Sequence, residues 1–318
     1  MRIGCFLSCE EFTPRELLHQ ARLAQAAGLD RLWISDHYHP WNDEQGQSPF
    51  VWSMIGALAT HVPGMHVTTG VTCPTLRIHP AVIAQAAATS KVLLDGRFRL
   101  GVGSGEALNE HILGDAWPSA DVRLAMLEES IEIMRALWEG GQVSHDGDHY
   151  TVENARLYTL PGEPVEVIVS GFGPKAISLA AAVGDGFASV APEAEDVRRF
   201  RAEGGGDKVC QAGTKVCWGP DEDEAVETVH RLWPNEGLPG ELAQVLPTPA
   251  HFEQASGLVT KEMIRESVPC GPDVDRIVAA LQAYADAGFD ELYVSQIGSR
   301  QDEWFEVLER DVLPRFAA

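Results

Sequence analysis

The sequence predicts a (β/α)8 barrel, or TIM barrel, and three observations lead to this fold class. Short β-like runs alternate with helical patterns from one end of the chain to the other, as parallel strands joined by crossover helices require. Eight such runs can be counted, which is the number that closes this barrel. The 318 residues, 45% of them hydrophobic, suffice to bury one large core. We therefore expect a single barrel domain over residues 1–318.

The first half of the barrel is predicted from residues 2–140. The sequence RIGCFLS at 2–8 is the first expected strand, and Thr13-Pro14 then marks a helix start. Leucine and alanine keep helical spacing from there to Gly28, which completes one strand and helix unit. A long helical pattern at 121–140 closes this half. The other strands of the half are expected at 31–35, 66–71 and 98–103.

The second half continues the same alternation but contains two insertions. Its strands are expected at 165–171, 186–190, 213–218 and 290–296. The segment at about 142–160 is predicted as a hairpin insertion, because Asp146-Gly147 stands between two short β-like runs. The segment at about 234–270 is Pro-rich and longer than an ordinary connection. We expect it to be irregular and to form a lid or a substrate-side insertion.

Charge and cysteine content exclude several classes of protein. The formal net charge is −23, from 24 Lys and Arg against 47 Asp and Glu, which argues against binding to nucleic acid or to an anionic membrane. The N-terminus lacks the apolar run of a signal peptide, and no stretch approaches the roughly 18 apolar residues of a membrane span. Six cysteines are scattered without a C-x-x-C pair. They indicate free thiols in a reducing compartment, so we expect a cytoplasmic protein.

The active site of such a barrel forms at the carboxyl ends of its strands, where one sequence allows three interpretations. SDHYHPW at 35–41 could provide a pair of metal ligands, a general base with its partners, or a turn that happens to contain His37 and His39. A metal pair needs further ligands, yet the last four strands end in SGFG, VAP, WGP and SQIG, without His or Asp. Glu10 and Glu106, which follow other strands, could still supply carboxylates. Glu106, Trp41 and glycine-rich loops at the same barrel end favour the general base over the turn.

Two glycine-rich segments are suited to close approach of a ligand to the backbone. GVGSGEALNE at 101–110 and SGFGPKAI at 170–177 each open a helical pattern and could present N–H groups to an anion or to a polarised ring oxygen. Neither matches the full dinucleotide fingerprint or a P-loop, so a separate dinucleotide domain is not expected. Lys175 could neutralise a phosphate, or it could be a solvated helix lysine.

The quoted segments resemble one known family. SDHYHPW together with GSGEALNE is similar to the coenzyme F420-dependent (deazaflavin) branch of the luciferase-like barrel oxidoreductases, and within it to the glucose-6-phosphate dehydrogenase group. EEFTPREL, HPAVIAQAAAT, LWEGGQVSHDGDHY and AAAVGDGF also resemble family segments. The resemblance weakens after residue 190, up to the closing ADAGFDELYVSQIG. It implies F420 as cofactor, with FMN as the alternative, a small-molecule alcohol, lactol or sugar as substrate, and a homodimer.

The resemblance also implies residue roles. His37 is expected to take the hydroxyl proton of the substrate while a hydride passes to C5 of the deazaflavin, and Glu106 to protonate the reduced ring. Trp41 is expected to form a wall beside the substrate, and Glu10 to lie near the base. A histidine, with an ordinary pKa of about 6.5, suits such a base, and an apolar site can keep a carboxyl protonated. The implied cofactor contacts are Asp36, Gly70, Val71, Cys73, Ser104, Gly105, Asn109, Ser170, Gly171, Phe172 and Gly173, with a nonprolyl cis peptide at Gly70-Val71.

The chain departs from the sugar-phosphate members of this family in the second half of the barrel. Those members hold phosphate with two lysines and an arginine. Ala191 and Pro192 stand here where one lysine is expected, Gln254 stands at the other, and only Arg265 remains as a substrate residue. Losing two of three cations should cost several kcal/mol of charge-assisted bonding. We therefore predict that glucose 6-phosphate is a poor substrate. An FMN-dependent monooxygenase and a noncatalytic flavin-binding protein remain as alternatives.

Overall fold

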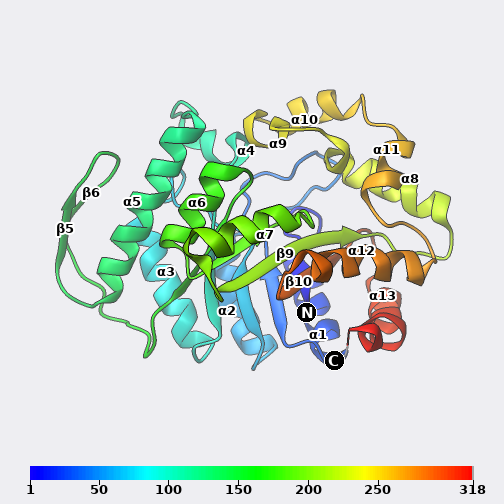
Figure 1. The fold of residues 1–318 in the computed structure, drawn as a ribbon, viewed down its shortest axis with the longest axis horizontal. Helices are drawn as coiled ribbons and strands as arrows, with labels where there is room; N and C mark the ends of the chain where they lie inside the picture. Colours follow the sequence, from blue (N-terminus) through cyan, green and yellow to red (C-terminus); the bar gives the residue numbers. More distant parts are fainter. Residues whose placement is uncertain (317–318) are drawn as a thin grey trace.

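A computed structural model describes residues 1–316 and contains the closed parallel barrel that the sequence predicts (Figure 1). Eight strands are hydrogen-bonded in the order β1-β2-β3-β4-β7-β8-β9-β10, and β10 closes the ring onto β1. Strand β9 begins four residues earlier than the predicted start at 213. The strands are β1 (Arg2–Leu7), β2 (Arg31–Ile34), β3 (His66–Thr69), β4 (Phe98–Val102), β7 (Glu166–Ser170), β8 (Gly186–Ser189), β9 (Val209–Val216) and β10 (Glu291–Gln296).

Helices surround the barrel, and the first illustrates how local sequence sets their ends. Helix α1 (Pro14–Ala26) begins with a capping box, in which Thr13 and Glu16 satisfy each other's backbone N–H groups. None of the helices within residues 1–316 is long and apolar enough to cross a membrane. The other helices around the barrel are α2 (Val51–His61), α3 (Pro80–Leu93), α5 (Ala120–Trp138), α6 (Pro174–Val183), α7 (Ala194–Phe200), α12 (Val274–Ala287) and α13 (Gln301–Val307).

The lumen of the barrel is filled by side chains rather than open. The indole of Trp33 stacks on Tyr293 with ring centroids 4.9 Å apart and an interplanar angle of 8°. Glycines make room for it, because a Cβ on Gly70 or Gly213 would lie 2.9 or 2.6 Å from the indole. Trp33 therefore forms a floor, above which only the carboxyl ends of the strands can form a binding site.

The predicted hairpin insertion is confirmed. Strands β5 (Val143–Asp146) and β6 (Thr151–Ala155) pair antiparallel outside the barrel. The carboxylate of Glu129 on α5 accepts hydrogen bonds from backbone N–H groups of the turn, including that of Tyr150 at 2.9 Å. The hairpin is thus fixed to α5 and lies on its outer side (Figure 1), while the hydroxyl of Tyr150 in the turn donates to the carbonyl oxygen of Thr75 in the loop after β3 at 2.8 Å.

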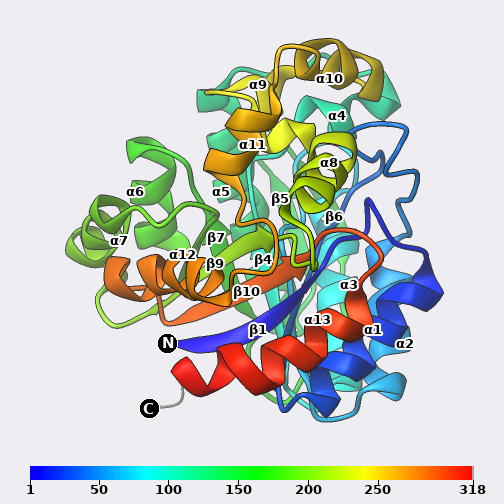
Figure 2. The same cartoon turned by 90° about the vertical axis from the view of Figure 1, so that its right-hand side faces the viewer.

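The second insertion is helical, so the prediction of an irregular segment was wrong. It follows helix α8 (Glu222–Leu232) and packs its apolar side chains into a cluster of its own, which includes Phe252 and Ile264. Trp41 and Leu108 from the barrel loops belong to the same cluster. Figure 2 shows the insertion beside α4 (Ala107–Glu110), which follows a barrel strand. It comprises a 3₁₀ turn (Pro234–Gly237), α9 (Leu242–Val245), α10 (Pro249–Ser256) and α11 (Lys261–Ser267).

Candidate active site

Three predicted catalytic side chains meet above the barrel floor. The Nε2 atom of His37 lies 3.3 Å from Oε1 of Glu10 and 3.6 Å from Oε2 of Glu106. The histidine follows β2, and the two carboxyl groups follow β1 and β4, so the closure of the barrel brings them together. The side chains of His37 and Glu10 are 11% and 3% exposed, whereas that of Glu106 is 30% exposed. Glu106 is therefore the member most open to a ligand.

Backbone contacts fix the tautomer of His37. Its Nδ1 atom lies 3.2 Å from the carbonyl oxygen of His39. A carbonyl oxygen can only accept, so Nδ1 must carry the hydrogen. In the neutral ring, Nε2 then keeps its lone pair and points toward the two carboxyl groups. This is the arrangement that a proton-accepting histidine needs.

Glu10 is oriented by its own neighbours. The hydroxyl of Ser35 donates to Oε2 of Glu10 at 2.9 Å, and the backbone N–H of Cys9 donates to the hydroxyl oxygen of Ser35 at 2.8 Å. This relay leaves Oε1 of Glu10 directed at His37. Ser35 begins the SDHYHPW segment, but its role depends on a contact that the sequence pattern does not reveal.

Glu106 is set up to hold a proton. Burial raises the pKa of its carboxyl group, and the nearby charge of Glu10 adds to this, while His37 opposes it. The side-chain amide of Asn109 donates to Oε2 of Glu106 at 3.2 Å. The carbonyl oxygen of the same amide accepts from the backbone N–H groups of Tyr38 and His39 at 2.9 and 3.1 Å. Asn109 thus joins the loop of the base to the loop of the acid.

An aromatic wall stands beside His37. The ring centroids of His37 and Trp41 are 5.1 Å apart, and those of Trp41 and Phe252 are 5.0 Å apart at 78°. Phe252 comes from α10, so the second insertion supports the wall from behind. The predicted position of Trp41 next to the base therefore depends on a segment more than 200 residues further along the chain.

Asp36 is held in a buried ionic network beneath the catalytic loop. Its carboxylate accepts from Thr72 and from Arg77, each at 2.8 Å, and the side chain is fully buried. Arg77 also donates through its backbone N–H to Glu110 at 2.8 Å. Sequence reasoning missed Arg77 and Glu110, although both follow barrel strands within the predicted loops.

A glycine-lined surface lies next to Glu106, the predicted acid. The peptide bond between Gly70 and Val71 is cis, as expected. The half-buried Val71 side chain packs where Gly101 and Gly103 have no side chains, since a Cβ on Gly103 would lie 2.9 Å from Val71. The same Cβ would lie 3.7 Å from Ser170, which links this surface to the loop after β7. Of the other predicted cofactor contacts, Cys73 is buried, and Ser104 and Gly105 are half-buried.

The loop after β7 ends at an open helix N-terminus. Phe172 is 54% exposed, an unusual state for a phenylalanine, and Gly173 adopts φ +104° without a side-chain cap on α6. Gly171 is buried within the same loop. Lys175 points away on the surface and pairs with Asp121 at 2.7 Å, which agrees with the interpretation as a solvated helix lysine.

The positions expected to bind phosphate are not brought together with one another as the catalytic side chains are. The guanidinium of Arg265 on α11 pairs with Asp223 at 2.6 Å and with Glu262 at 3.4 Å. Gln254 is exposed on α10, and after β8 Ala191 is half-buried and Pro192 is exposed. Arg265 therefore stays a prediction, since its recorded ionic partners are surface carboxylates and none is a residue of the catalytic group.

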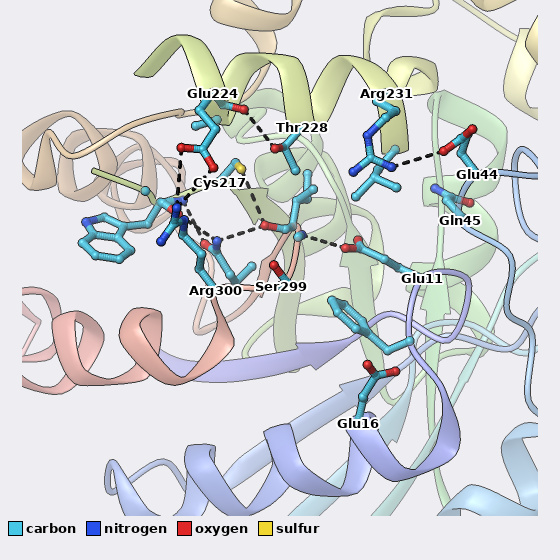
Figure 3. Close-up of a pocket in the computed structure, with 18 of the residues that line it drawn as sticks. Glu11, Glu16, Glu44, Gln45, Cys217, Glu224, Thr228, Arg231, Ser299 and Arg300 are labelled. Atoms are coloured by element: carbon cyan, nitrogen blue, oxygen red, sulfur yellow. Dashed lines mark hydrogen bonds and ion pairs between the residues drawn. The ribbon is translucent and has the colours of Figure 1, made fainter. Parts of the chain in front are cut away.

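A separate cavity of about 400 Å³ opens behind this group, between α8, the loop after β10 and the start of α1 (Figure 3). Glu11 lies in its lining and accepts hydrogen bonds from the indole of Trp233 and from the backbone N–H of Gly298, each at 2.6 Å. Burial raises the pKa of Glu11 to about 7, although both hydrogen bonds oppose the shift. His37 is not among the side chains that line the cavity, but Glu11 is the chain neighbour of Glu10, and the lining residue Gln45 accepts from the backbone N–H of Trp41 at 2.8 Å.

The rings of His37 and His39 do not point toward one common position at which a metal ion could bind. Nδ1 of His39 lies 2.9 Å from the carbonyl oxygen of Leu108, while Nε2 of His37 faces the two carboxyl groups. Within residues 1–316 there is no group of three or more His, Cys, Asp and Glu side chains with metal-binding geometry. All six cysteines are free and buried.

Known proteins resemble this chain over its whole length. The family model described as luciferase-like monooxygenase matches residues 1–291. An F420-dependent glucose-6-phosphate dehydrogenase from Mycobacterium avium (strain 104) is 33% identical, over 99% of this chain and 98% of that protein. One of the same name from Segniliparus rotundus is 34% identical with the same coverage. A solved structure, an F420-dependent secondary alcohol dehydrogenase in complex with an F420-acetone adduct, has a TM-score of 0.92 at 30% identity, covering 100% of this chain and 99% of that one.

Proposed function

Since this chain belongs to the luciferase-like monooxygenase family, we propose that it is an F420-dependent oxidoreductase acting on a CH–OH group. The observation that carries the proposal is the position of Nε2 of His37 between Glu10 and Glu106. The relatives that match it from end to end are named as F420-dependent dehydrogenases, and one of similar fold as an alcohol dehydrogenase. The resemblance noted in the sequence thus agrees with independent comparisons.

The residues of the barrel mouth fit a flat ring with an anionic tail. Val71 and the backbone around Gly103 form a smooth surface that a side chain at Gly103 would disrupt. The exposed Phe172 and the uncapped N-terminus of α6 supply an apolar contact and free N–H groups. We propose that these residues hold the cofactor, together with Gly70, Cys73, Ser104, Gly105, Ser170, Gly171 and Gly173, while Asp36 and Asn109 position the loops around it.

The chain's own residues manage the protons of the reaction. His37 accepts the substrate hydroxyl proton at Nε2, and the carboxylate of Glu10, 3.3 Å away, stabilises the resulting imidazolium. Burial raises the pKa of Glu106, which favours its protonated form, and in that form it can deliver a proton into the site. When bound, the deazaflavin supplies the redox step by exchanging a hydride with the alcohol carbon.

Trp41 restricts where the substrate can lie. Its indole packs between His37 and Phe252, so a substrate whose hydroxyl reaches Nε2 of His37 must lie along the wall. Trp41 is 9% exposed, and its indole shields the proton transfer from bulk water. An alcohol with an apolar face next to its hydroxyl suits this arrangement.

The substrate is proposed to lack a phosphate group. The two lysine positions of the sugar-phosphate members hold Pro192 and Gln254, and Arg265 is already paired with Asp223. A phosphate would have to break that ion pair and would meet no other cation of the expected set. An alcohol, lactol or neutral sugar meets no such penalty.

We also propose a cytoplasmic homodimer. Six free cysteines in 318 residues suit a reducing compartment. The dimer rests on the family resemblance alone, and sedimentation of the purified protein tests it directly.

The decisive experiment is a titration with two cofactors. Purified protein is titrated with oxidised F420 and separately with FMN, with tryptophan fluorescence as the signal. We expect micromolar quenching by F420, followed by loss of the visible F420 absorbance when an alcohol is added. Tight binding of FMN alone would indicate a flavin monooxygenase, and binding of neither would overturn the proposed function.

A further inference from the structure

Lys215 occupies a lumen position that the sequence analysis overlooked. Alternate residues of a strand face the same side, and Gln211 of β9 faces inward, since its side chain accepts a hydrogen bond from the indole of Trp33 at 3.0 Å. Gly213 also faces inward, because a Cβ there would meet the same indole at 2.6 Å. Lys215 is the next residue on this face, one step nearer the carboxyl end of the barrel.

The ammonium group of Lys215 lies among aromatic rings and one carboxylate. Its Nζ atom is 2.8 Å from Oε1 of Glu236 and 4.3 and 5.7 Å from the ring centroids of Trp233 and Phe6. The side chains of Lys215 and Glu236 are 15% and 28% exposed, so the pair is sheltered but reachable. Trp233 in turn donates to Glu11, next to the partner of the catalytic histidine.

Stability alone does not account for this pair. Removing a lysine and a carboxylate from water costs more than a Lys–Glu contact usually returns, so apolar residues of similar volume would pack this corner as well or better. Neighbouring inward-facing positions hold the large aromatic side chains of Phe6, Trp33 and Tyr293. Glu236 also comes from the second insertion rather than from the barrel, so the pair forms only where the insertion meets the lumen.

We propose that Lys215 and Glu236 recognise the non-reacting hydroxyl groups of a neutral polyol or sugar. The inference rests on the proposed function and names its substrate class. A hydroxyl both donates and accepts, so neighbouring hydroxyls can accept from the ammonium group of Lys215 and donate to the carboxylate of Glu236. A phosphate is disfavoured because Glu236 already neutralises Lys215, and Glu11 lies close by. An alcohol with a single hydroxyl would leave the pair unused.

Two substitutions and one control test this assignment. Lys215→Met keeps the aliphatic length without the charge, Glu236→Gln keeps the size of the acceptor, and Lys175→Met removes a surface lysine that pairs with Asp121. Each variant is assayed with F420 on glucose, xylose, glycerol and 2-propanol. Loss of one charge-assisted hydrogen bond should raise KM for the neutral polyols about tenfold in Lys215→Met, with a smaller rise in Glu236→Gln.

The readouts separate this inference from the proposed function. F420 affinity, kcat at saturating polyol and activity on 2-propanol should stay near wild type in Lys215→Met, and every parameter should do so in Lys175→Met. A wild-type enzyme that oxidises 2-propanol but none of the polyols would overturn the inference and leave the proposed function intact. An equal loss of activity on all substrates in Lys215→Met would also overturn it. Failure of the wild type to bind F420 would instead reject the proposed function.

Discussion

Two glutamates at opposite ends of the barrel, Glu291 and Glu106, have opposite surroundings. At the amino end, Glu291 is fully buried and contacts the guanidinium groups of Arg2, Arg31 and Arg99. The arginines outweigh the effect of burial and lower the pKa of Glu291. At the carboxyl end, Glu10 and Glu106 share a single histidine. Burial there raises the pKa of Glu106.

This contrast distinguishes a structural carboxylate from a reactive one. A carboxylate surrounded by arginines stays charged through the physiological pH range and holds strands together. A carboxyl group that lacks such partners is ready to gain or lose a proton. In the proposed function, the same residue type therefore serves stability at Glu291 and proton transfer at Glu106, and neighbouring cations decide which.

The largest expected effect comes from removing His37, the proposed proton acceptor. His37→Ala should lower kcat by about 10²–10⁴-fold, because it removes the proposed acceptor of the hydroxyl proton. Steady-state kinetics with F420 measure the loss, and F420 titration confirms that the cofactor site is intact. His39→Gln is the matched control and should cost far less, since His39 faces the carbonyl oxygen of Leu108. Equal losses in the two variants would instead favour a shared metal site.

The second prediction compares the effect of a Glu→Gln substitution at Glu291 with that of the same substitution at Glu106. Glu291→Gln should lower the free energy of unfolding by about 3–5 kcal/mol, because Arg31 and Arg99 lose their buried counter-charge. Glu106→Gln should leave that free energy nearly unchanged, because burial already disfavours the anionic form of Glu106. It should reduce kcat, because the proposed proton donor is lost. Urea unfolding and kinetics on both variants provide the test. Destabilisation of similar size in both would show that the two ends do not differ.

The smallest effect concerns pH and Glu11. Because the pKa of Glu11 is raised to about 7, the folded protein keeps a proton that the unfolded chain releases above pH of about 4.5. The folded state binds more protons in this window, so its stability falls as pH rises toward 7. Glu11→Gln should remove this decline, about 2 kcal/mol, in urea unfolding measured at pH 5 and pH 7.5. Glu291 acts in the opposite direction, since its lowered pKa stabilises the fold above pH of about 4.5 and is lost in acid. Identical pH slopes in the variant and the wild type would contradict the account of Glu11.

The sequence predicted the barrel and its mouth because both depend on short-range patterns. Periods of two and of 3.6 residues locate strands and helices, and the residues after parallel strands must meet at one end. Glu10, His37, Trp41 and Glu106 could thus be assigned to one place before any coordinates. The hairpin around Asp146-Gly147 was predictable for the same local reason.

Other features were out of reach because they depend on distant partners. The proline content of the second insertion suggested an irregular segment. The segment is helical because Phe252 and Ile264 pack into an apolar cluster that includes Trp41. Arg265 matched an expected position in the chain, yet its guanidinium faces Asp223. Arg77 and Glu110 became visible only when their contacts around Asp36 were known.

By itself, the sequence determined the fold class, the number of strands and the set of side chains at the barrel mouth. Only the tertiary structure decided the direction in which burial and charge shift the pKa of Glu106, which way Lys215 points, and which carboxylates are paired with arginine. The physical reason is that patterning acts between neighbours along the chain, whereas burial and ion pairing depend on distances in space. Glu291 and Arg31, 260 residues apart in sequence and in direct contact in the barrel, show the difference.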